Sequence, residues 1–288
     1  MSWRTVVITS TSKLDYQAGY LVVRSKDIKR VHLSEIAVVM VESTAVSITS
    51  YLMNELVKRN IKIVFCDEKH NPCAEVLPLH GKQDDAERIR EQIQISENRK
   101  SEAWTQIVRA KISNQKHLLV LKNKEGISLL EDYENQIEPG DITNREAVAA
   151  RIYFESLFGK DFTREEVIPI NAALNYCYMV LCSLVSREIS ASGYLTALGI
   201  HHTNHANSFN LSCDLMEPFR PLVDKFVFEN ISTQFETDEK HMVIRFLEQE
   251  VLIHDRKEYF INAVGIYVKS VLDFLVCESN EIKFPSIL

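Results

Sequence analysis

The chain has 288 residues, of which 45% are hydrophobic, with only eight glycines and seven prolines. This composition excludes wholesale disorder, favours helix over a turn-rich all-β protein, and leaves room for two domains. The net charge of −7 argues against a simple sequence-blind nucleic-acid binder. The acidic excess lies in residues 126–288, which hold 25 acidic against 13 basic side chains. Nucleic acid bound there would need local basic patches and neutralising cations.

The cysteines and the apolar segments indicate the cellular compartment. Six cysteines form no C-x-x-C pair, and no signal peptide precedes them, so we expect reduced thiols in a cytoplasmic protein. The longest apolar stretch, residues 172–185, contains Asn175 and is too short to cross a bilayer. It predicts a buried helix and no association with a membrane.

Short segments rich in β-branched residues dominate the first eighty residues and predict a small, mostly β domain. Its expected strands cover residues 5–9, 20–24, 37–41, 61–66 and 75–79, with a turn at residues 71–72 before the last strand. One helix fits between them, capped by Ser47 and carrying an apolar stripe from Ile48 to Val57.

From residue 84 onward the pattern is helical. Residues 84–124 predict one long, charged helical stretch with possible breaks, whose inner face is marked by Trp104, Ile107, Ile112 and Leu118. Further helices are expected at about residues 144–158, 171–192, 218–235, 240–252 and 255–277. The predicted fold class is α+β, with an N-terminal β domain over residues 1–82 and a larger all-α C-terminal domain over residues 83–288.

Residues 199–224 place three histidines within five positions and follow them with carboxylates and an arginine. Imidazole and carboxylate ligands together suit a divalent cation, and an arginine beside them suits either a phosphate or a salt bridge. A zinc site of the H-E-x-x-H type is disfavoured, because no glutamate follows the first histidine. Loop histidines bonded to nearby backbone are the alternative. The residues concerned are His201, His202, His205, Asp214, Glu217, Arg220 and Asp224.

Two glutamates have both a structural and a functional interpretation. Glu217 precedes Pro218, so it fits an N-cap position where a carboxylate interacts favourably with the helix dipole. Glu146 completes a capping-box pattern with Thr143, yet its helical neighbour Tyr153 should point inward. A glutamate on that face is costly to bury unless it is paired or bound to a metal ion.

Several basic and polar side chains could contact a ligand. Lys111 and Lys116 lie with other basic residues along the long helical stretch, where a solvated face is the simpler interpretation. Asn171 and Tyr176 are polar residues at the start of an otherwise buried helix and need partners, either internal or from a ligand. The chain contains no phosphate loop, dinucleotide fingerprint or nucleophile elbow, which argues against common nucleotide hydrolases, NAD enzymes and serine hydrolases.

Motifs in a fixed order span nearly the whole chain. They lie in residues 3–8 and 63–72, and then in Asn144-Arg-Glu146-Ala-Val-Ala-Ala-Arg151-Ile-Tyr153, Asn171-Ala-Ala-Leu-Asn175-Tyr176, Gly199-Ile-His-His202 and Asp214-Leu-Met-Glu217-Pro-Phe-Arg220-Pro221. Together they resemble the CRISPR-associated integrase-endonuclease family, the larger of the two proteins common to CRISPR adaptation modules. The details are most similar to the version found in type II systems.

The resemblance implies a metal-dependent DNA endonuclease and integrase, which joins a DNA 3′-hydroxyl to a phosphodiester at a repeat boundary and so inserts short foreign duplexes (spacers) into a CRISPR array. It implies a catalytic centre that binds Mg²⁺ or Mn²⁺ through Glu146, His202 and Glu217. His201 and His205 are rivals of His202, and Asp214 is the rival of Glu217. Contacts to DNA would come from Arg220, Lys111, Lys116, Asn171 and Tyr176.

The same resemblance implies partners. The protein would form a homodimer through its N-terminal domain and pair with a small ferredoxin-like adaptation protein. Its substrate would be double-stranded DNA, as prespacer and CRISPR repeat, in the prokaryotic cytoplasm. Two alternatives stay open: a stand-alone divalent-metal nuclease that uses water as nucleophile, and a non-catalytic DNA-binding scaffold.

Overall fold

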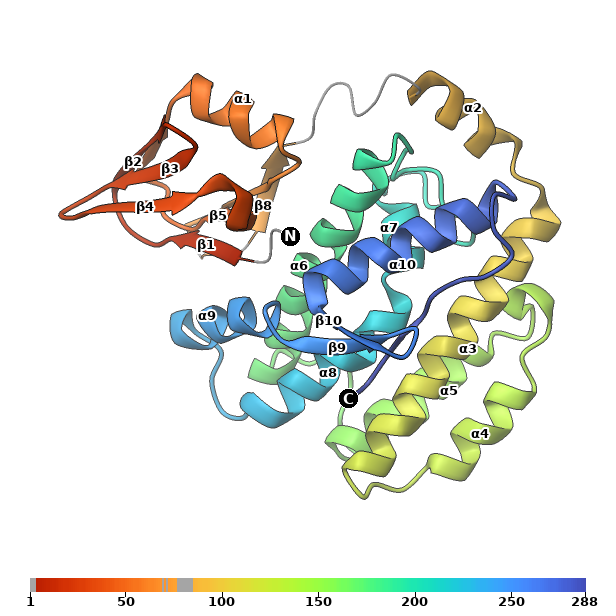
Figure 1. The fold of residues 1–288 in the computed structure, drawn as a ribbon. Helices are drawn as coiled ribbons and strands as arrows, with labels where there is room; N and C mark the ends of the chain where they lie inside the picture. Colours follow the sequence, from red (N-terminus) through yellow and green to blue (C-terminus); the bar gives the residue numbers. More distant parts are fainter. Residues whose placement is uncertain (1–3, 69, 71, 77–84) are drawn as a thin grey trace.

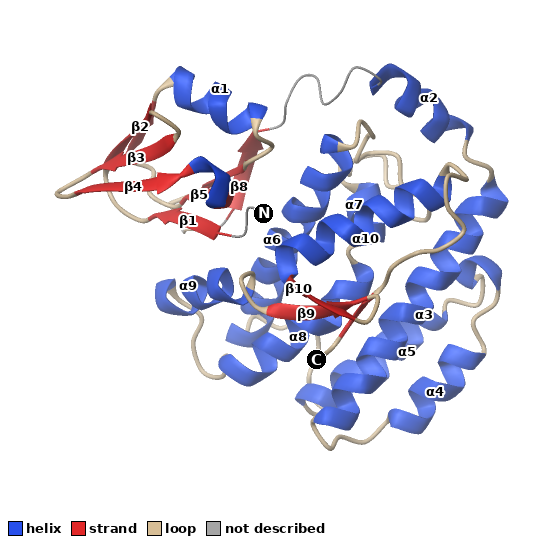
Figure 2. Ribbon diagram, viewed as in Figure 1, coloured by secondary structure: helices blue, strands red, loops and turns tan. Residues whose placement is uncertain are grey.

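The computed structural model describes residues 4–288 except 69, 71 and 77–84. A β-rich N-terminal part lies beside a larger part in which helices dominate (Figure 1). Figure 2 shows that most strands gather in the first part, with a helix along one side of them. The predicted α+β fold class is confirmed.

The N-terminal part contains two four-stranded sheets. Its elements are β1 (Arg4–Ile8), β2 (Ser12–Gln17), β3 (Tyr20–Arg24), β4 (Ile28–His32), η1 (Leu33–Glu35), β5 (Ile36–Val41), β6 (Val46–Ile48), α1 (Ser50–Lys58), β7 (Lys62–Cys66) and β8 (Pro72–Val76). One sheet has the order β1-β5-β7-β8 and the other β4-β3-β2-β6. Apolar side chains of both sheets, among them Leu14, Leu21 and Ile63, enclose a core with Leu52 of α1.

β5 connects this part to the helices. All six of its residues are buried, as expected for a central strand that pairs in parallel with β1 and β7. Because successive side chains point to opposite faces, Val39 and Val41 enter the core of the β part, whereas Val38 and Met40 pack with the helical part. One strand therefore belongs to two cores.

The helical part is arranged around two long helices, α3 and α6. Its elements are α2 (Asp85–Gln94), α3 (Glu97–Leu121), α4 (Ile127–Asn135), η2 (Pro139–Asp141), α5 (Arg145–Phe158), α6 (Pro169–Ala191), α7 (Asn210–Leu215), η3 (Glu217–Phe219), α8 (Arg220–Asn230), α9 (Thr237–Phe246), β9 (Glu250–Ile253), β10 (Arg256–Tyr259), α10 (Phe260–Leu275) and β11 (Pro285–Ser286). α6 packs against α7, α8 and α10, while α3 packs against α5, η3 and α8. The predicted inner face of α3 is confirmed, since Trp104, Ile107, Ile112 and Leu118 are buried.

α6 matches the prediction of a buried apolar helix. By length and composition it is apolar enough to cross a membrane, but most of it is buried inside the protein. Its side chains fill the main core between the β part and the other helices, which is the ordinary place of such a helix in a globular protein.

The C-terminal part is mostly helical but also contains a small sheet, so the all-α description needs correction. β9 and β10 form a hairpin within segments predicted as helix over 240–252 and 255–277, and β11 completes an antiparallel sheet. His254 and Asp255 at the hairpin tip have φ values of 48° and 61°. These are the left-handed values of a two-residue turn whose twist matches the flanking strands.

Other boundaries also differ from the prediction. The long helical stretch breaks before Ser96, whose hydroxyl caps α3 by accepting the backbone N–H of Arg99. α1 is capped by Thr49 rather than Ser47, which lies in β6. The predicted domain boundary at 82–83, the end of the strand predicted at 75–79, and residues 3 and 71 lie outside the described residues. The division into two domains stays a proposal.

Candidate metal centre

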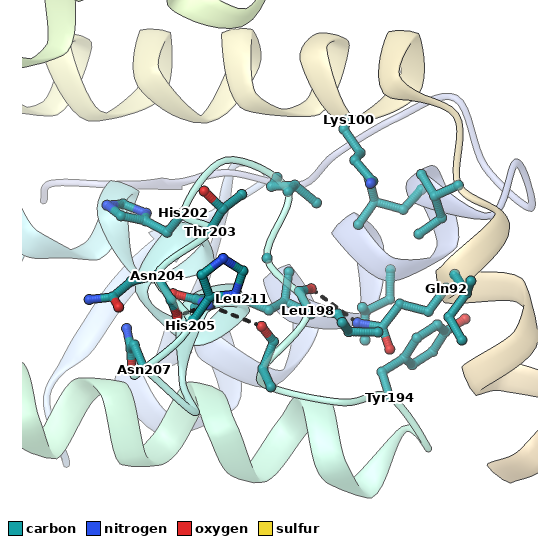
Figure 3. Close-up of a pocket in the computed structure, with 18 residues that line it drawn as sticks. Gln92, Lys100, Tyr194, Leu198, His202, Thr203, Asn204, His205, Asn207 and Leu211 are labelled. Carbon is teal, nitrogen blue, oxygen red and sulfur yellow. Dashed lines mark hydrogen bonds between the residues drawn. The ribbon is translucent and has the colours of Figure 1, made fainter.

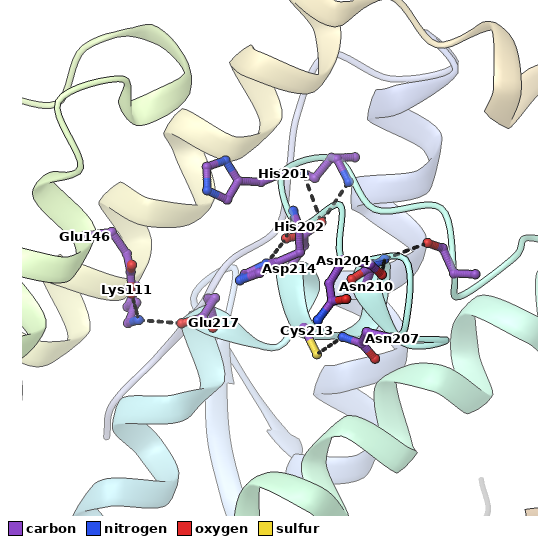
Figure 4. Close-up of polar contacts among 12 residues, drawn as sticks. Lys111, Glu146, His201, His202, Asn204, Asn207, Asn210, Cys213, Asp214 and Glu217 are labelled. Atoms are coloured by element: carbon purple, nitrogen blue, oxygen red, sulfur yellow. Dashed lines mark hydrogen bonds and ion pairs between the residues drawn. The ribbon is translucent and has the colours of Figure 1, made fainter. Parts of the chain in front are cut away.

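Three elements that are distant in sequence bring two carboxylates and an ammonium group together (Figure 4). Lys111 of α3 forms an ion pair with Glu146 of α5, and its Nζ lies 2.5 Å from Glu217 Oε2 at the start of η3. Lys111 is 6% exposed and Glu217 is 4% exposed, whereas Glu146 is half-buried. The interpretation of Lys111 as part of a solvated face is therefore wrong.

The charges of this trio support one another. Burial lowers the pKa of Lys111, but Glu217 and Glu146 raise it more, so the pKa lies above its usual value. Burial raises the pKa of Glu217, but Arg220 and Lys111 lower it more, so this pKa lies below its usual value. Both groups are thus charged at neutral pH. Two carboxylates that face one cation supply oxygen donors of the kind that a divalent metal ion binds.

The cap of α5 leaves Glu146 free for this contact. The interpretation of Thr143 and Glu146 as a capping box, one of the two left open for Glu146, is wrong, because Asp141 caps the helix instead. Its two carboxylate oxygens accept the backbone N–H groups of Arg145 at 2.8 Å and of Glu146 at 3.0 Å. Since these donors are satisfied, the Glu146 side chain does not fold back and extends to Lys111.

The loop after α6 wraps around the carboxylate of Asp214. The backbone N–H groups of Ile200, His201 and His202 donate to it at 2.7, 3.0 and 3.1 Å. Gly199 permits this approach, because a Cβ at this position would lie 2.3 Å from His202 O and 2.8 Å from Asp214 Oδ2. The Gly-x-x-His motif is therefore the sequence of a loop that closes on a buried carboxylate.

Asp214 also orients His202. Its Oδ1 lies 2.5 Å from His202 Nδ1, and this hydrogen bond raises the pKa of His202 against the opposing effect of burial. The charge of Glu217 adds to the rise, so the imidazole lies in the field of the carboxylate pair. Engagement of Nδ1 leaves Nε2 for a ligand, as in carboxylate–histidine–metal arrangements. The hydrogen bonds on Asp214 favour Glu217 over Asp214 as a metal ligand.

Buried side chains support Glu217 from the protein interior. Arg220 Nε lies 2.8 Å from Glu217 Oε1, and the guanidinium lies 4.4 Å from the centre of the Tyr178 ring. Tyr178 and Tyr153 donate their hydroxyls to Asp224, the latter at 2.9 Å. Burial raises the pKa of Asp224 to about 6, although both hydroxyls act to lower it. Arg220 thus has internal partners, and its contact with DNA stays a prediction.

The other two histidines of the loop take different positions. The His201 ring stacks on Trp104 of α3, with ring centroids 4.2 Å apart and 5° between the planes. His205 and His202 line a cavity of about 420 Å³ beside the loop (Figure 3). The structure thus brings Glu146 and Glu217 together with His202 nearby, while His201 is held against the indole.

Three further residues predicted to contact DNA have internal partners. Lys116 Nζ lies 2.8 Å from a carboxylate oxygen of Glu134 in α4. The Asn171 side chain donates to two backbone carbonyls of the preceding loop at 2.7 and 2.9 Å. Tyr176 is buried, with its hydroxyl 3.8 Å from the sulfur of Met40 in β5. Their contact with DNA stays a prediction.

The donors suit a divalent cation in their chemistry, but they do not form a closed site. Glu146, Glu217 and His202 supply oxygen and nitrogen donors of the kind that Mg²⁺ or Mn²⁺ accepts. Across the described residues, no three His, Cys, Asp or Glu side chains lie close enough together to hold a metal ion. Lys111 Nζ lies where the two carboxylates meet, so a metal ion shared by both requires this ammonium group to move aside.

The sequence pattern does not predict how two side chains are placed at this candidate centre. It assigns Lys111 to a surface or to DNA, although this residue follows Trp104 by seven positions and so falls on the inner face of α3. It treats Asp214 as a rival ligand, whereas the structure places it as the group that orients His202. The periodicity of α3 was a usable signal for Lys111, but the loop geometry around Asp214 has no local signature.

Sequence and structure comparisons each find similar proteins. The family model described as CRISPR associated protein Cas1 matches residues 5–259. The CRISPR-associated endonuclease Cas1 of Neisseria meningitidis serogroup C (strain 8013) is 33% identical over 297 residues, covering 100% of this chain and 97% of that protein. A solved casposase bound to integration product is 16% identical with a TM-score of 0.75, covering 98% of this chain and 92% of the casposase. A chain of a solved Cas6-RT-Cas1–Cas2 complex is 17% identical with a TM-score of 0.71. The match covers 96% of this chain and 35% of the longer chain in the complex.

Proposed function

The chain belongs to the Cas1 family of CRISPR-associated proteins, and we propose that it is a metal-dependent DNA endonuclease and integrase of CRISPR adaptation. It inserts short DNA duplexes into a CRISPR array, by attack of a DNA 3′-hydroxyl on a phosphodiester at the repeat boundary. Two findings support this proposal: a relative named as a CRISPR-associated endonuclease, and a similar fold solved with an integration product.

The observation that carries the proposal is the convergence of Glu146 and Glu217 beside His202. A divalent cation bound by these donors would stabilise the charge that develops on the transferring phosphoryl group and lower the pKa of the attacking hydroxyl. Because Arg220 and Lys111 hold the pKa of Glu217 low, its carboxylate accepts a cation without first losing a proton. The single imidazole makes Mn²⁺ at least as suitable as Mg²⁺.

The chain's own residues also orient this set of donors. Asp214 binds His202 Nδ1 and three backbone N–H groups of the loop, so ring and loop are held as one unit. Arg220 holds the other carboxylate oxygen of Glu217. Preorganisation of this kind reduces the reordering that would otherwise oppose the reaction.

We extend the proposal to the partners. The protein would act as a homodimer through its N-terminal part, with a small ferredoxin-like adaptation protein, on double-stranded DNA in the cytoplasm. Similar solved chains that occur in Cas6-RT-Cas1–Cas2 complexes support such a partnership. The assignment to a type II-like version depends on the sequence motifs alone.

A joining assay tests the reaction. The protein and its small partner are incubated with a labelled duplex carrying 3′-hydroxyl ends and a plasmid carrying a CRISPR repeat, with Mg²⁺, Mn²⁺ or EDTA. We expect joined products only with metal, and none from Glu217→Gln at unchanged circular dichroism. Glu229→Gln is the matched control, because Glu229 is exposed on α8 and pairs only with Lys122 at the surface in the described structure.

Each other outcome points to a different function. Nicked plasmid without joined product would favour the stand-alone nuclease. Absence of metal binding in calorimetry would favour the non-catalytic scaffold. Strand transfer retained by Glu217→Gln would overturn the assignment of the site.

A further inference from the structure

Beside the candidate metal centre, two stacked rings form a flat platform. The imidazole of His201 lies parallel to the indole of Trp104, at 4.2 Å between centroids. Trp104 is 3% exposed beneath it, whereas His201 itself is exposed. One face of the imidazole is therefore supported by the indole, and the other is open to a ligand.

The position of this platform is fixed relative to the carboxylates. The backbone N–H of His201 donates to Asp214, which also binds the neighbouring His202. Trp104 precedes Lys111 by two helical turns on the same face of α3, a rise of about 10 Å along the axis. A single DNA strand with stacked bases advances roughly 3.4 Å per nucleotide, so about three nucleotides cover this distance.

We propose that the His201–Trp104 pair is a stacking site for a nucleobase of the strand that carries the reacting 3′-hydroxyl. The inference rests on the proposed function and deepens it, because it names what holds the end of the substrate strand. Stacking on a flat ring tolerates any sequence, since every base has a π face, and one such contact contributes about 5- to 100-fold in affinity. A protein that captures foreign DNA of arbitrary sequence needs a contact of this kind.

The structure also explains why His201 rather than Trp104 meets the base. Trp104 is buried in the core of the helical part, so its indole is rigid but inaccessible. His201 extends this rigid surface by one ring, and its backbone bond to Asp214 does not depend on its side chain. Substitution of the side chain therefore tests stacking without opening the loop.

The test uses the full chain and single-stranded oligonucleotides that end in a 3′-deoxynucleotide, which cannot be joined, so Mn²⁺ can be present. A 2-aminopurine placed in turn at each of the last four positions reports stacking by quenching, and anisotropy gives the affinity. We expect the wild type to quench the fluorescence at one position. His201→Ala should abolish this quenching and lower the affinity for the oligonucleotide about 5- to 100-fold. His201→Phe should keep both, and His205→Ala, which removes another exposed imidazole of the loop, should bind like the wild type.

An abasic nucleotide at the quenched position completes a double-mutant cycle. It should remove the difference in affinity between the wild type and His201→Ala. An unchanged difference, or no quenching at any position, would overturn the stacking site. If the wild type joins DNA but the cycle shows no coupling between the His201 side chain and the base, only the stacking site is rejected. If the wild type neither binds nor joins DNA, the proposed function is rejected as well.

Discussion

A lysine between two carboxylates has two opposed effects. Without a metal ion, Lys111 compensates the negative charge of Glu217. This compensation matters because burial of an unpaired carboxylate has a high cost in free energy. A metal ion bound by the same oxygens would compete with this ammonium group. We therefore expect Lys111 to stabilise the metal-free fold and to weaken metal binding.

Replacement of Lys111 by methionine should separate these effects. Lys111→Met keeps the side-chain volume but leaves Glu217 with Arg220 as its remaining cation, so we expect a loss of about 3–5 kcal/mol in the free energy of unfolding without metal. Saturating Mn²⁺ should restore much of it, because the metal binds the folded state only. Thermal unfolding with and without Mn²⁺ measures both effects.

The matched control for this variant is Lys116→Met. Lys116 lies on the same helix but is partly exposed and pairs with Glu134 and Glu131. We expect it to lose about 1 kcal/mol at most and to respond to Mn²⁺ like the wild type. A Mn²⁺ response of Lys111→Met no larger than that of the control would contradict the competition between lysine and metal.

Asp224 makes stability depend on pH in a defined direction. Burial raises its pKa to about 6 in the folded protein, from an ordinary value of 3.8. The folded state therefore binds this proton more tightly than the unfolded state, and stability falls as the pH rises from about 4 to about 6. The group costs up to about 3 kcal/mol once both states are ionised.

The variant Asp224→Asn removes this titration and keeps one oxygen, which accepts one of the two tyrosine hydroxyls, since Tyr178 donates to Oδ1 and Tyr153 to Oδ2 of Asp224. Between about pH 4 and 7, the free energy of unfolding of the wild type should fall by about 3 kcal/mol relative to the variant. Urea denaturation of both proteins across this range gives the difference directly. A difference that stays constant with pH would show that Asp224 does not titrate in this range.

At the scale of elements, the cap of α5 links stability to the site. Asp141 has a left-handed φ of 52° and binds the first two N–H groups of α5. Asp141→Ala loses both acceptors and disfavours this backbone, so we expect a loss of about 1–3 kcal/mol. It should also weaken Mn²⁺ binding in calorimetry, because Glu146 lies in the first turn. Asp141→Asn tolerates the same backbone conformation and keeps one acceptor, so it should lose less free energy of unfolding than Asp141→Ala. An equal loss in the two variants would contradict the capping role.

The elements that sequence predicts well have long, one-sided apolar patterns. α5 and α6 begin and end within about two residues of their predicted bounds. Burial of one helix face repeats apolar residues every three to four positions, and this spacing can be read from the sequence. The β9–β10 hairpin is missed for a physical reason. Val251-Leu252-Ile253 is a short apolar run that fits helix or strand equally, and the His254-Asp255 turn lacks the glycine that usually signals a hairpin.

At the scale of the whole molecule, the site depends on contacts that no local pattern contains. Lys111 and Glu146 are 35 positions apart, and they meet only because α3 packs against α5. The family resemblance supplies Glu146, His202 and Glu217 as a set, and the structure places them near one another. The period of α3 already places Lys111 on the buried face of the helix, but its two carboxylate partners follow from packing and could not be predicted from the sequence.

Polar contacts also fix the β part to the helical part. Lys62 of β7 is fully buried and pairs with Glu75 of β8, whose carboxylate accepts the hydroxyl of Ser183 in α6 at 2.9 Å. Arg187 of α6 donates to the backbone oxygen of Ala37 in β5 at 3.0 Å. Burial lowers the pKa of Lys62 although Glu75 acts to raise it.

This buried pair should respond unequally to loss of either partner. Glu75→Gln leaves Lys62 charged and buried without its partner, so we expect a loss of about 3–5 kcal/mol in the free energy of unfolding. Lys62→Met should cost less, because Glu75 stays partly exposed and bonded to Ser183. The double variant should recover most of the loss in urea denaturation. The loss in Glu75→Gln should also shrink as the pH rises, because a neutral amine is cheaper to bury. Equal, pH-independent losses in the two single variants would mean that packing, rather than charge, holds this junction together.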